Sequence, residues 1–357
     1  MTLLSFDWLL LLEKFLLIVI IVFTTLGIAL YTTFGERKVA AILQDRPGPN
    51  RAGPFGILQP LADGVKMFTK EEIIPTHANK WLFILGPGLA MVASLMTCAV
   101  IPWGGTVHIF DRNISLQIAD VNIGVLYIFA VVSMGIYGIM IGGWASNNKF
   151  SLISSLRAAS QAISYELAMG LSLIALLFTT GTLSLGTIVK EQQNHLWNVC
   201  YQPLGFLIFF ICAMAECNRT PFDLPEAENE LNFGYHQEYS SMKLGFYLFA
   251  EYINMIMSSA VMASLYFGGY DIPFVDDSLL YNSSGFWQTM APLFQVGTLL
   301  SKIVIFIFVF MWIRWTIPRF RYDQLMNLGW KKLIPLALIN MVITGALVIL
   351  KINHWHF

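Results

Sequence analysis

Eight long runs of apolar residues constrain this chain more than any other feature of its sequence. A helix needs roughly 20 apolar residues to cross the hydrocarbon core of a membrane. Backbone groups in hydrocarbon must pair within their own segment, so we expect helices, since a barrel would show short alternating strands instead. The expected spans lie near residues 9–33, 81–101, 121–145, 160–180, 202–217, 244–268, 294–317 and 333–352.

The composition agrees with lipid as the main solvent of the chain. Only 12% of the 357 residues are charged and 56% are hydrophobic, whereas a soluble domain carries about 25% charged residues. No repeat of fixed period and no low-complexity linker divides the chain. We therefore expect an all-α, polytopic membrane protein that forms one domain over residues 1–357. The first span begins too late and runs too long for a cleaved signal peptide, so it is predicted to stay as an anchor.

Lys and Arg residues are concentrated in alternate loops between the expected spans. The even-numbered loops hold only Arg112 and Lys190. Because loops rich in Lys and Arg remain on the cytoplasmic side, we expect the odd-numbered loops inside and both termini on the non-cytoplasmic side. The basic residues of the odd loops are Arg37, Lys38, Arg46, Arg51, Lys66, Lys70, Lys80, Lys149, Arg157, Arg219, Lys243, Arg319, Arg321, Lys331 and Lys332.

The first inside loop contains a Gly- and Pro-rich stretch, residues 46–54, followed by a segment with helical periodicity, residues 55–70. Apolar residues such as Leu58, Leu61 and Val65 recur at helical spacing, which predicts a short amphipathic helix. We expect it to lie in the headgroup region with its lysines toward water. The alternative is a surface helix that only seals the domain.

The fifth loop carries an unusual concentration of carboxylates. They are Glu216, Asp223, Glu226, Glu228 and Glu230, with Glu238 shortly after. Carboxylates at a membrane face are unfavourable unless water, cations or protons meet them there. The loop therefore suggests proton traffic more than packing.

Further acidic residues fall inside or at the ends of expected spans. Glu166 lies on a polar stripe with Gln161 and Tyr165, and Glu251 lies inside the sixth span. A carboxylate within a membrane is a functional candidate by default; the alternative for Glu166 is a hydrogen-bonded structural role. For Glu36, at the end of the first span, the simplest alternative is an ion pair with the adjacent Arg37.

For Glu216, at the end of the fifth span, the corresponding alternative is a local ion pair with Arg219. Neither alternative requires any function. The four carboxylates Glu36, Glu166, Glu216 and Glu251 could instead form a chain of ionisable groups within the bilayer.

The sequence predicts no bound metal and no redox centre. No CxxC pair or His/Cys cluster occurs, so iron–sulfur and zinc sites are not expected. Most aromatic residues, including Tyr235 and Tyr252, are interpreted as packing or interfacial residues. No basic patch with interleaved aromatics indicates nucleic-acid binding. The cysteines are Cys98, Cys200, Cys212 and Cys217, and the histidines are His77, His108, His195, His236, His354 and His356.

Several long motifs, in order along the chain, resemble one membrane subunit of respiratory complex I. This is the quinone-site subunit, called the H subunit in bacteria and subunit 1 in mitochondria. The resemblance runs from about residue 30 to the last span. It is carried by Glu36-Arg37-Lys38, by residues 46–63, 142–149, 156–166 and 215–228, by Glu238-Tyr239, by residues 319–326 and by Trp330-Lys331.

The resemblance implies a subunit of the proton-translocating NADH:quinone oxidoreductase of the respiratory electron-transport chain. Such a subunit joins the membrane arm to the peripheral arm and forms the membrane part of the tunnel that admits ubiquinone or menaquinone. It carries no redox centre of its own. Its implied partners are the two soluble subunits at the head of the tunnel, adjacent small membrane subunits, the quinone and the lipid bilayer.

The resemblance also implies roles for individual residues. The buried acidic positions that couple quinone chemistry to proton pumping match Glu36, Glu166, Glu216 and Glu251, and the loop near the quinone cavity matches Glu226, Glu228 and Glu230. The tunnel positions match Arg37, Arg46, Asp63, Phe222 and Asp223. Cys217 departs from the Thr that the motif often has, and Leu167 departs from the common Val, but neither change affects an acidic position.

Other functions remain as alternatives. Related subunits serve photosynthetic complexes and membrane-bound hydrogenases, where the electron donor differs. A secondary transporter would usually show a pair of related repeats with broken helices, and a structural anchor would only dock soluble redox subunits. The extended N-terminus and the long sixth loop favour a bacterial plasma membrane, with the mitochondrial inner membrane as the alternative.

Overall fold

The computed structural model describes residues 8–109, 112–273 and 286–350. In this part of the chain, seven helices are long and apolar enough to cross a membrane. Four of them are α1 (Trp8–Leu43), α4 (Gly124–Ala145), α5 (Lys149–Thr180) and α10 (Ser241–Tyr266). The other three are Lys80–Ala99, which begins with α3 (Lys80–Met96), Met290–Thr316 within α12 (Phe286–Thr316), and Tyr322–Ile349, which ends with α14 (Ile334–Ile349). The all-α membrane fold is thus supported, with seven such helices.

The predicted fifth span, residues 202–217, is present as a helix with nearly the predicted bounds, but this helix is short for a membrane span. Helix α8 (Pro203–Glu216) has 14 residues, fewer than a helix needs to cross the hydrocarbon core. Pro203 occupies the first turn, where its missing N–H is tolerated, and the helix ends at Glu216, where the acidic loop begins. The count of eight spans is therefore not established by helix length.

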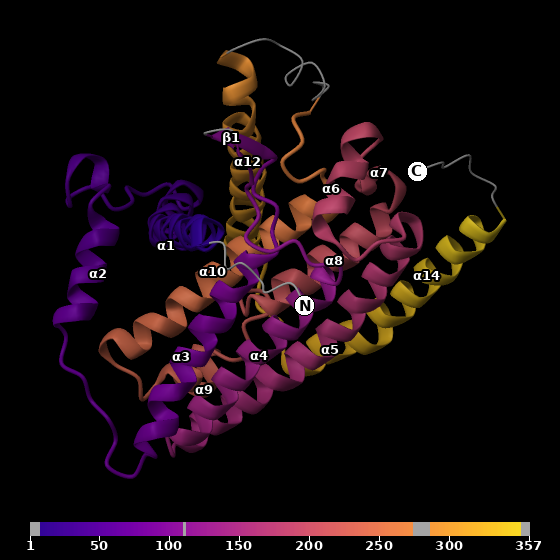
Figure 1. The fold of residues 1–357 in the computed structure, drawn as a ribbon. Helices are drawn as coiled ribbons and strands as arrows, with labels where there is room; N and C mark the ends of the chain where they lie inside the picture. Colours follow the sequence, from indigo (N-terminus) through magenta and orange to yellow (C-terminus); the bar gives the residue numbers. More distant parts are fainter. Residues whose placement is uncertain (1–7, 110–111, 274–285, 351–357) are drawn as a thin grey trace, which may run out of the picture.

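Helices α3, α4, α5, α10 and α14 run side by side in Figure 1, whereas α12 crosses their direction and α1 is seen nearly end-on. Helix α4 lies between α3 and α5, and α5 also contacts α8 and α14. Helix α10 contacts α1, α3 and α12. Glycines allow the closest approach between α3 and α4: a Cβ on Gly138 would lie 2.7 Å from the backbone nitrogen of Ala90. Small residues of this kind let membrane helices pack closely.

Two of the helices extend beyond the spans expected from hydropathy. Helix α1 continues to Leu43, so Glu36 and Arg37 lie within the helix instead of ending it. Helix α5 begins at Lys149, where the Asn148 side chain accepts a hydrogen bond from the Phe150 amide. Such N-caps stabilise a helix start. The helix ends at Gly181, which has a left-handed conformation with φ of 66°, as is common after the last helical residue.

The predicted amphipathic helix is present as α2 (Gln59–Thr69). It follows a short 3-10 turn, η1 (Pro54–Gly56). The side chains of Leu61, Val65 and Phe68 are exposed. An exposed apolar face of this kind is typical of a helix that lies at a lipid interface.

A small two-stranded sheet was not expected from the sequence. Strand β1 (Thr106–Ile109) pairs antiparallel with β2 (Arg112–Ser115). Its strands are too short to give a clear alternating pattern. The remaining short elements are η2 (Thr97–Ala99), α6 (Leu185–Asn194), α7 (Asn198–Tyr201), α9 (Glu228–Leu231), η3 (Gly234–His236), α13 (Tyr322–Asn327) and the π-helical η4 (Leu328–Leu333).

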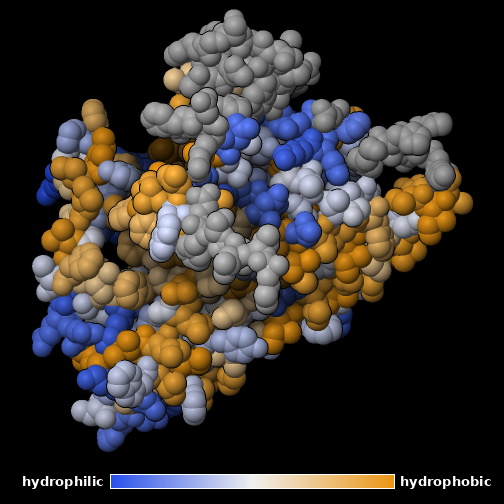
Figure 2. Space-filling model, viewed as in Figure 1, coloured by the Kyte–Doolittle hydropathy of each residue, from blue (hydrophilic) through white to orange (hydrophobic). Residues whose placement is uncertain are grey.

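The surface of the bundle carries the apolar band that a membrane protein needs. Figure 2 shows hydrophobic residues along the helices and hydrophilic residues gathered toward their two ends. Large apolar side chains project outward, for example Phe23 on α1 at 70% exposure and Val342 on α14 at 66%. The interior is densest around α8 and α10, where Cys212, Ile256 and Tyr266 are fully buried.

Candidate functional site

The acidic loop between α8 and α10, residues 217–240, folds back onto helix α5. The Gln161 amide donates hydrogen bonds to the carbonyl oxygens of Ala215 at 2.7 Å and of Phe222 at 2.8 Å. The Ser154 hydroxyl donates to the Pro225 carbonyl and accepts from the Tyr235 amide at 3.0 Å. Gln161, one residue of the predicted polar stripe, therefore anchors the loop.

Glu251 lies at the centre of the buried polar groups. One carboxylate oxygen accepts a 2.8 Å hydrogen bond from the Tyr235 hydroxyl. The other oxygen lies 3.2 Å from a guanidinium nitrogen of Arg219, and that guanidinium also stacks 4.4 Å from the centre of the Tyr252 ring. Arg219 thus pairs with Glu251 and not with Glu216, so the local pair that the spacing allowed is wrong.

Glu36 joins this group from helix α1. The Tyr252 hydroxyl donates a 2.7 Å hydrogen bond to one carboxylate oxygen of Glu36, and Arg314 of α12 pairs with the other. Arg37 instead contacts Asp63 of α2 at 2.8 Å. The alternative of a Glu36–Arg37 pair is wrong, because adjacent residues on a helix point in different directions.

These contacts form one connected group, which we call the inner network. It comprises Glu36, Tyr252, Arg219, Glu251 and Tyr235, and it links α1 and α12 to α10 and the acidic loop. Charged groups that are so deeply buried are tolerated only when they are paired. The network therefore connects the buried carboxylates and the cations that pair with them in one continuous set of contacts.

Glu226 and His236 extend the network within the loop. The imidazole of His236 is fully buried, with Nδ1 3.7 Å from Glu226 and Nε2 3.9 Å from Glu251. Burial lowers the pKa of His236 to about 4, with Glu226 opposing the shift and Arg219 adding to it. The ring is therefore neutral at pH 7.

By distance alone, Glu226, His236 and Glu251 could hold a metal ion, because one ligand atom from each lies within 4.8 Å of the others. The neighbouring charge argues against this. With both carboxylates ionised, Arg219 leaves one excess negative charge in the group. One proton neutralises that charge, whereas a divalent ion would leave an excess positive charge beside a buried guanidinium.

Phe222 and Asp223 lie where the loop meets the segment after α12. Asp223 is buried and pairs with Arg319 at 2.6 Å. Burial, together with the charge of Glu226, raises the pKa of Asp223 to about 7, and the charge of Arg319 opposes this shift. The ring of Phe222 packs edge-on against Tyr165 with centroids 5.5 Å apart. Asp223 is thus poised to change charge near neutral pH.

Glu166 and Glu216 form a second acidic pair. Glu166 accepts a 3.0 Å hydrogen bond from Ser133, and the charges of Glu166 and Glu216 act on each other. Glu216 lines a cavity of about 40 Å³ between α4, α8 and α10. Cys217, which also lines this cavity, borders the small space beside Glu36 and Arg219 as well.

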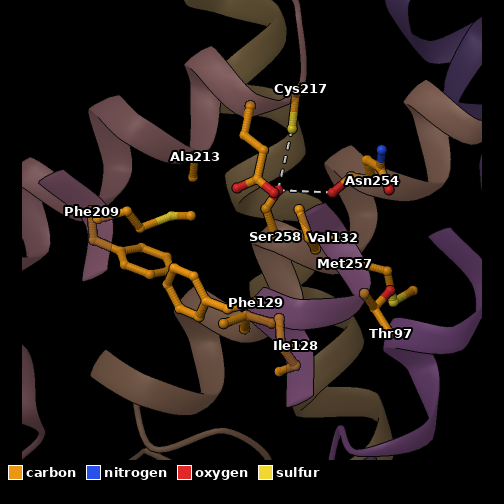
Figure 3. Close-up of a pocket in the computed structure, with 13 residues that line it drawn as sticks. Thr97, Ile128, Phe129, Val132, Phe209, Ala213, Cys217, Asn254, Met257 and Ser258 are labelled. Carbon is orange, nitrogen blue, oxygen red and sulfur yellow. Dashed lines mark hydrogen bonds between the residues drawn. The ribbon is translucent and has the colours of Figure 1, made fainter. Parts of the chain in front are cut away.

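Figure 3 shows the walls of this cavity. Cys217, Ser258 and Asn254 gather on one side, and Ile128, Phe129 and Phe209 are grouped on another. Ser258 lies 3.2 Å from the Cys217 sulfur and donates to the Asn254 carbonyl at 2.8 Å. The cavity is large enough for a water molecule, which needs roughly 10–15 Å³. Its polar side includes Cys217, the residue that also borders the small space beside Glu36 and Arg219.

Two of the predicted site residues, Glu230 and Arg46, lie on exposed parts of the loops and apart from these groups. Glu230 forms an ion pair with Arg157 at 2.6 Å, and its side chain is half exposed. Arg46 donates to the nearby Gln44 at 2.7 Å on an exposed part of the first inside loop. The side chain of Glu228 lies outside the part of the chain that the structure describes.

An apolar groove runs between α1 and α12. It has a volume of about 560 Å³, and its lining includes Gly27, Tyr31 and Phe308. Met311 lines both this groove and the small space beside Glu36 and Arg314. The groove therefore leads from the lipid-facing side of the bundle toward the inner network.

Comparison with known proteins assigns the family. The NADH dehydrogenase family profile matches residues 15–345. The chain is 64% identical over 340 residues to an H subunit of the NADH-quinone oxidoreductase of Cytophaga hutchinsonii, covering 95% of this chain and 98% of that protein. The chain belongs to the family of NADH-quinone oxidoreductase H subunits. The resemblance to the complex I membrane subunit, predicted from the motifs, is confirmed.

Other members of this H-subunit family match over a similar length. The chain is 59% identical to the H subunit of Flavobacterium johnsoniae, over 94% of this chain and 95% of that protein. It is 45% identical to an H subunit of Geobacter metallireducens, over 94% and 96% respectively. All three relatives are bacterial proteins. The family match covers the long helices and the acidic loop together.

Sequence reasoning missed several residues of the site in this H-subunit family member. Arg314 and Arg319 supply the cations for Glu36 and Asp223. Arg314 could have been found, because an Arg inside the expected span 294–317 needs a buried acidic partner. His236 gave no such signal, since its neighbours in sequence suggest neither a metal site nor a catalytic pair.

Proposed function

We propose that this chain forms the membrane part of the quinone passage in proton-translocating NADH:quinone oxidoreductase. We further propose that its buried carboxylates couple quinone reduction to proton translocation. The inner network carries this proposal, because it joins buried acidic groups of α1, α10 and the acidic loop through direct contacts. The names of the relatives, which specify NADH and quinone, support the overall reaction.

The coupling has a simple electrostatic basis. Quinone reduction takes up protons and changes the charge of the quinone head group. Charges interact strongly across a low dielectric, so a nearby loop that contains Asp223 and Glu226 would respond to that change. Carboxylates that interact this strongly titrate as a set. Protonation at the loop would then shift protonation at Glu251 and Glu36, and this step would start the pumping cycle.

The apolar groove between α1 and α12 is the proposed path for the quinone tail. A polyisoprenoid tail is apolar, and so is the lining that Gly27, Phe308 and Met311 contribute. The Arg37–Asp63 ion pair holds α2 against the inner end of α1. That contact would fix the amphipathic helix beside the passage, which gives Arg37 and Asp63 a positioning role.

The proposed topology follows the charge of the loops. With α8 counted as a short eighth span, the odd-numbered loops and the acidic loop face the cytoplasm and both termini face the opposite side of a bacterial plasma membrane. The whole chain would form one membrane domain. An impermeant thiol label should reach Lys190→Cys only from outside and Lys70→Cys only from inside. The reverse labelling pattern would overturn this topology.

The proposed partners follow from the location of the acidic loop. The soluble subunits that carry the head of the quinone site would dock on the inside loops, and small membrane subunits would pack beside the bundle. Either ubiquinone or menaquinone would serve as the substrate, with no redox centre on this chain. Related photosynthetic and hydrogenase complexes are less favoured, because the relatives are named for NADH and quinone.

Replacement of acidic groups in the assembled complex tests the proposal. We expect Glu216→Gln and Glu226→Gln to reduce quinone reduction and proton translocation, each measured in native membranes with NADH as donor. Glu230→Gln is the matched control, because Glu230 is half exposed and lies outside the network. NADH oxidation by a soluble artificial acceptor measures the amount of assembled enzyme. Full quinone reduction and full pumping in both test variants would refute the proposal.

A further inference from the structure

We propose that His236 transfers protons between Glu226 and Glu251, and so connects the acidic loop to the carboxylate inside helix α10. This inference rests on the function proposed above and names the residue that completes its proton path. Neither the motifs nor the comparisons give His236 a role. The geometry of its ring, in contrast, places one nitrogen toward each of two carboxylates, whose nearest ligand atoms lie within 4.8 Å of each other.

The two ring nitrogens of His236 face different acids. Nδ1 lies 3.7 Å from Glu226, and Nε2 lies 3.9 Å from Glu251. Neither nitrogen has a hydrogen-bond partner among the side chains that the structure describes. A buried polar group is usually hydrogen-bonded. The ring therefore has both of its polar atoms available to these two carboxylates.

The loop holds His236 firmly in this position. Ser151 donates to the Gly234 carbonyl at 3.3 Å, and the Tyr235 amide donates to Ser154 at 3.0 Å. The imidazole packs against the Tyr235 ring at a centroid distance of 3.9 Å and against Tyr247 at 5.6 Å. Fixed placement of the ring favours proton transfer, because transfer requires a short and directed contact.

Charged and titratable groups face the ring from two elements, and burial keeps the imidazole neutral against the opposing charge of Glu226. From the loop, the ring is faced by Glu226, Arg219 and Tyr235. From α10, it is faced by Glu251 and Tyr247. A neutral imidazole has one N–H donor and one nitrogen lone pair. It can therefore accept a proton on one side and donate a proton on the other.

The transfer balances in protons and charge. With the ring protonated at Nε2, the O–H bond of neutral Glu226 breaks and a bond forms between that proton and Nδ1. The Nε2–H bond then breaks, and that proton binds the Glu251 carboxylate. One proton has moved from Glu226 to Glu251, and the ring is neutral again. The ring then carries its proton on Nδ1, and the same two steps in reverse, which return the proton from Glu251 to Glu226, restore the Nε2–H tautomer.

The two observed distances mean that the path is closed in this structure and must shorten before a proton can move. Both exceed the roughly 2.6–3.2 Å between heavy atoms that proton transfer requires, so the acids and the ring must approach each other. Glu251 is held by Arg219 and Tyr235, whereas Glu226 belongs to the loop. A change in charge near the loop would move Glu226 toward Nδ1 and open the path.

Substitution of His236 in the assembled complex tests this inference. We expect His236→Gln to lower NADH-driven proton translocation by about tenfold or more, because an amide cannot relay a proton. NADH oxidation by an artificial acceptor should stay unchanged. His77→Gln, at an exposed position of the first inside loop, is the matched control. If His236→Gln does not assemble, His236→Asn provides the same test with a smaller amide.

A double variant separates a relay from a merely structural role. Residues on one path give losses that are not additive. The double variant of Glu226→Gln and His236→Gln should therefore translocate protons at a rate within about twofold of the slower of the two single variants. Losses that multiply, or pumping above half the wild-type rate in His236→Gln, would overturn the inference. If Glu251→Gln abolishes pumping while His236→Gln does not, only this inference fails. If Glu226→Gln and Glu251→Gln translocate protons at the wild-type rate as well as His236→Gln, both this inference and the proposed function fail.

Discussion

The hydroxyl of Tyr252 donates a 2.7 Å hydrogen bond to the carboxylate of Glu36, although the two residues lie 216 positions apart in the chain. The same tyrosine ring lies against the guanidinium of Arg219, which pairs with Glu251. Tyr252 is therefore the contact that joins the carboxylate of α1 to the carboxylate of α10. Removal of the Tyr252 side chain should therefore break the connection between the carboxylates of Glu36 and Glu251.

Tyr252→Phe isolates the contribution of this hydroxyl. The phenyl ring keeps its contact with Arg219, whereas the hydrogen bond to Glu36 is lost. A hydrogen bond to a charged group contributes about 1.5–3 kcal/mol, so we expect a lower melting temperature for the complex and a several-fold loss of proton translocation. Tyr137→Phe on α4 is the control, because Tyr137 is 60% exposed. Equal pumping in the two variants would show that the hydroxyl has no role.

Arg219→Gln should destabilise the complex strongly. It leaves Glu251 buried without its cation, and breaking a buried pair typically costs about 3–5 kcal/mol. Arg157→Gln removes only the cation of the half-exposed Glu230 and should cost about 0–1 kcal/mol. Thermal unfolding of the two variants, followed in detergent, measures the difference. Similar melting temperatures would contradict the burial of the Arg219–Glu251 pair.

Asp223→Asn should change how stability depends on pH. Burial and Glu226 raise the pKa of Asp223 from its ordinary value of 3.8 to about 7. The native state then binds more protons than the unfolded state in this window, so the contribution of Asp223 is fully present below pH 3.8 and is lost as pH rises to about 7. The stability of wild type relative to Asp223→Asn should therefore fall between these values and stay constant above them.

His236 should contribute the opposite slope. Its pKa is lowered by burial from 6.5 to about 4, so its contribution is present above pH 6.5 and is lost as pH falls toward 4. The melting temperature of Asp223→Asn, measured relative to that of the double variant with His236→Gln, should therefore rise with pH between about 4 and 6.5. If the melting temperature depends on pH in the same way in both variants, the pH dependence arises from a group other than His236.

Gly27→Phe should obstruct the groove between α1 and α12. Gly27 lines the groove, and a Cβ there has open space around it, so a phenyl ring would occupy the space instead of displacing the backbone. We expect the KM for long-tailed quinones to rise by about threefold or more, with a smaller effect on short-tailed quinones. Gly170→Phe on α5 is the control, since Gly170 is equally open but lies elsewhere. Equal effects on both quinones would exclude the groove as the passage.

Local sequence patterns were sufficient to predict most of the fold. Apolar runs located the seven long helices, and helical periodicity located α2. The β1–β2 hairpin was missed because its strands have only four residues each. The bounds of α8 were predicted to within one residue at each end, but its 14 residues do not support counting it as a full span.

The partners of the site residues could not be predicted in the same way. The carboxylates themselves were identified, since charge is rare in an apolar chain. Their cations were assigned to near neighbours, whereas the true partner of Glu36 is Arg314, 278 positions away. His236 is a further case, because only the folded loop brings it between Glu226 and Glu251. Such pairings depend on helix packing, which hydropathy and spacing do not specify.

The number of protons translocated per NADH oxidised, compared between wild type and Glu251→Gln in native membranes, tests the central claim most directly. Glu251 joins the loop to the rest of the inner network, so we predict that proton translocation is lost while NADH oxidation by an artificial acceptor is retained. Glu230→Gln should behave as wild type. Pumping by Glu251→Gln at the wild-type ratio and rate would contradict the account.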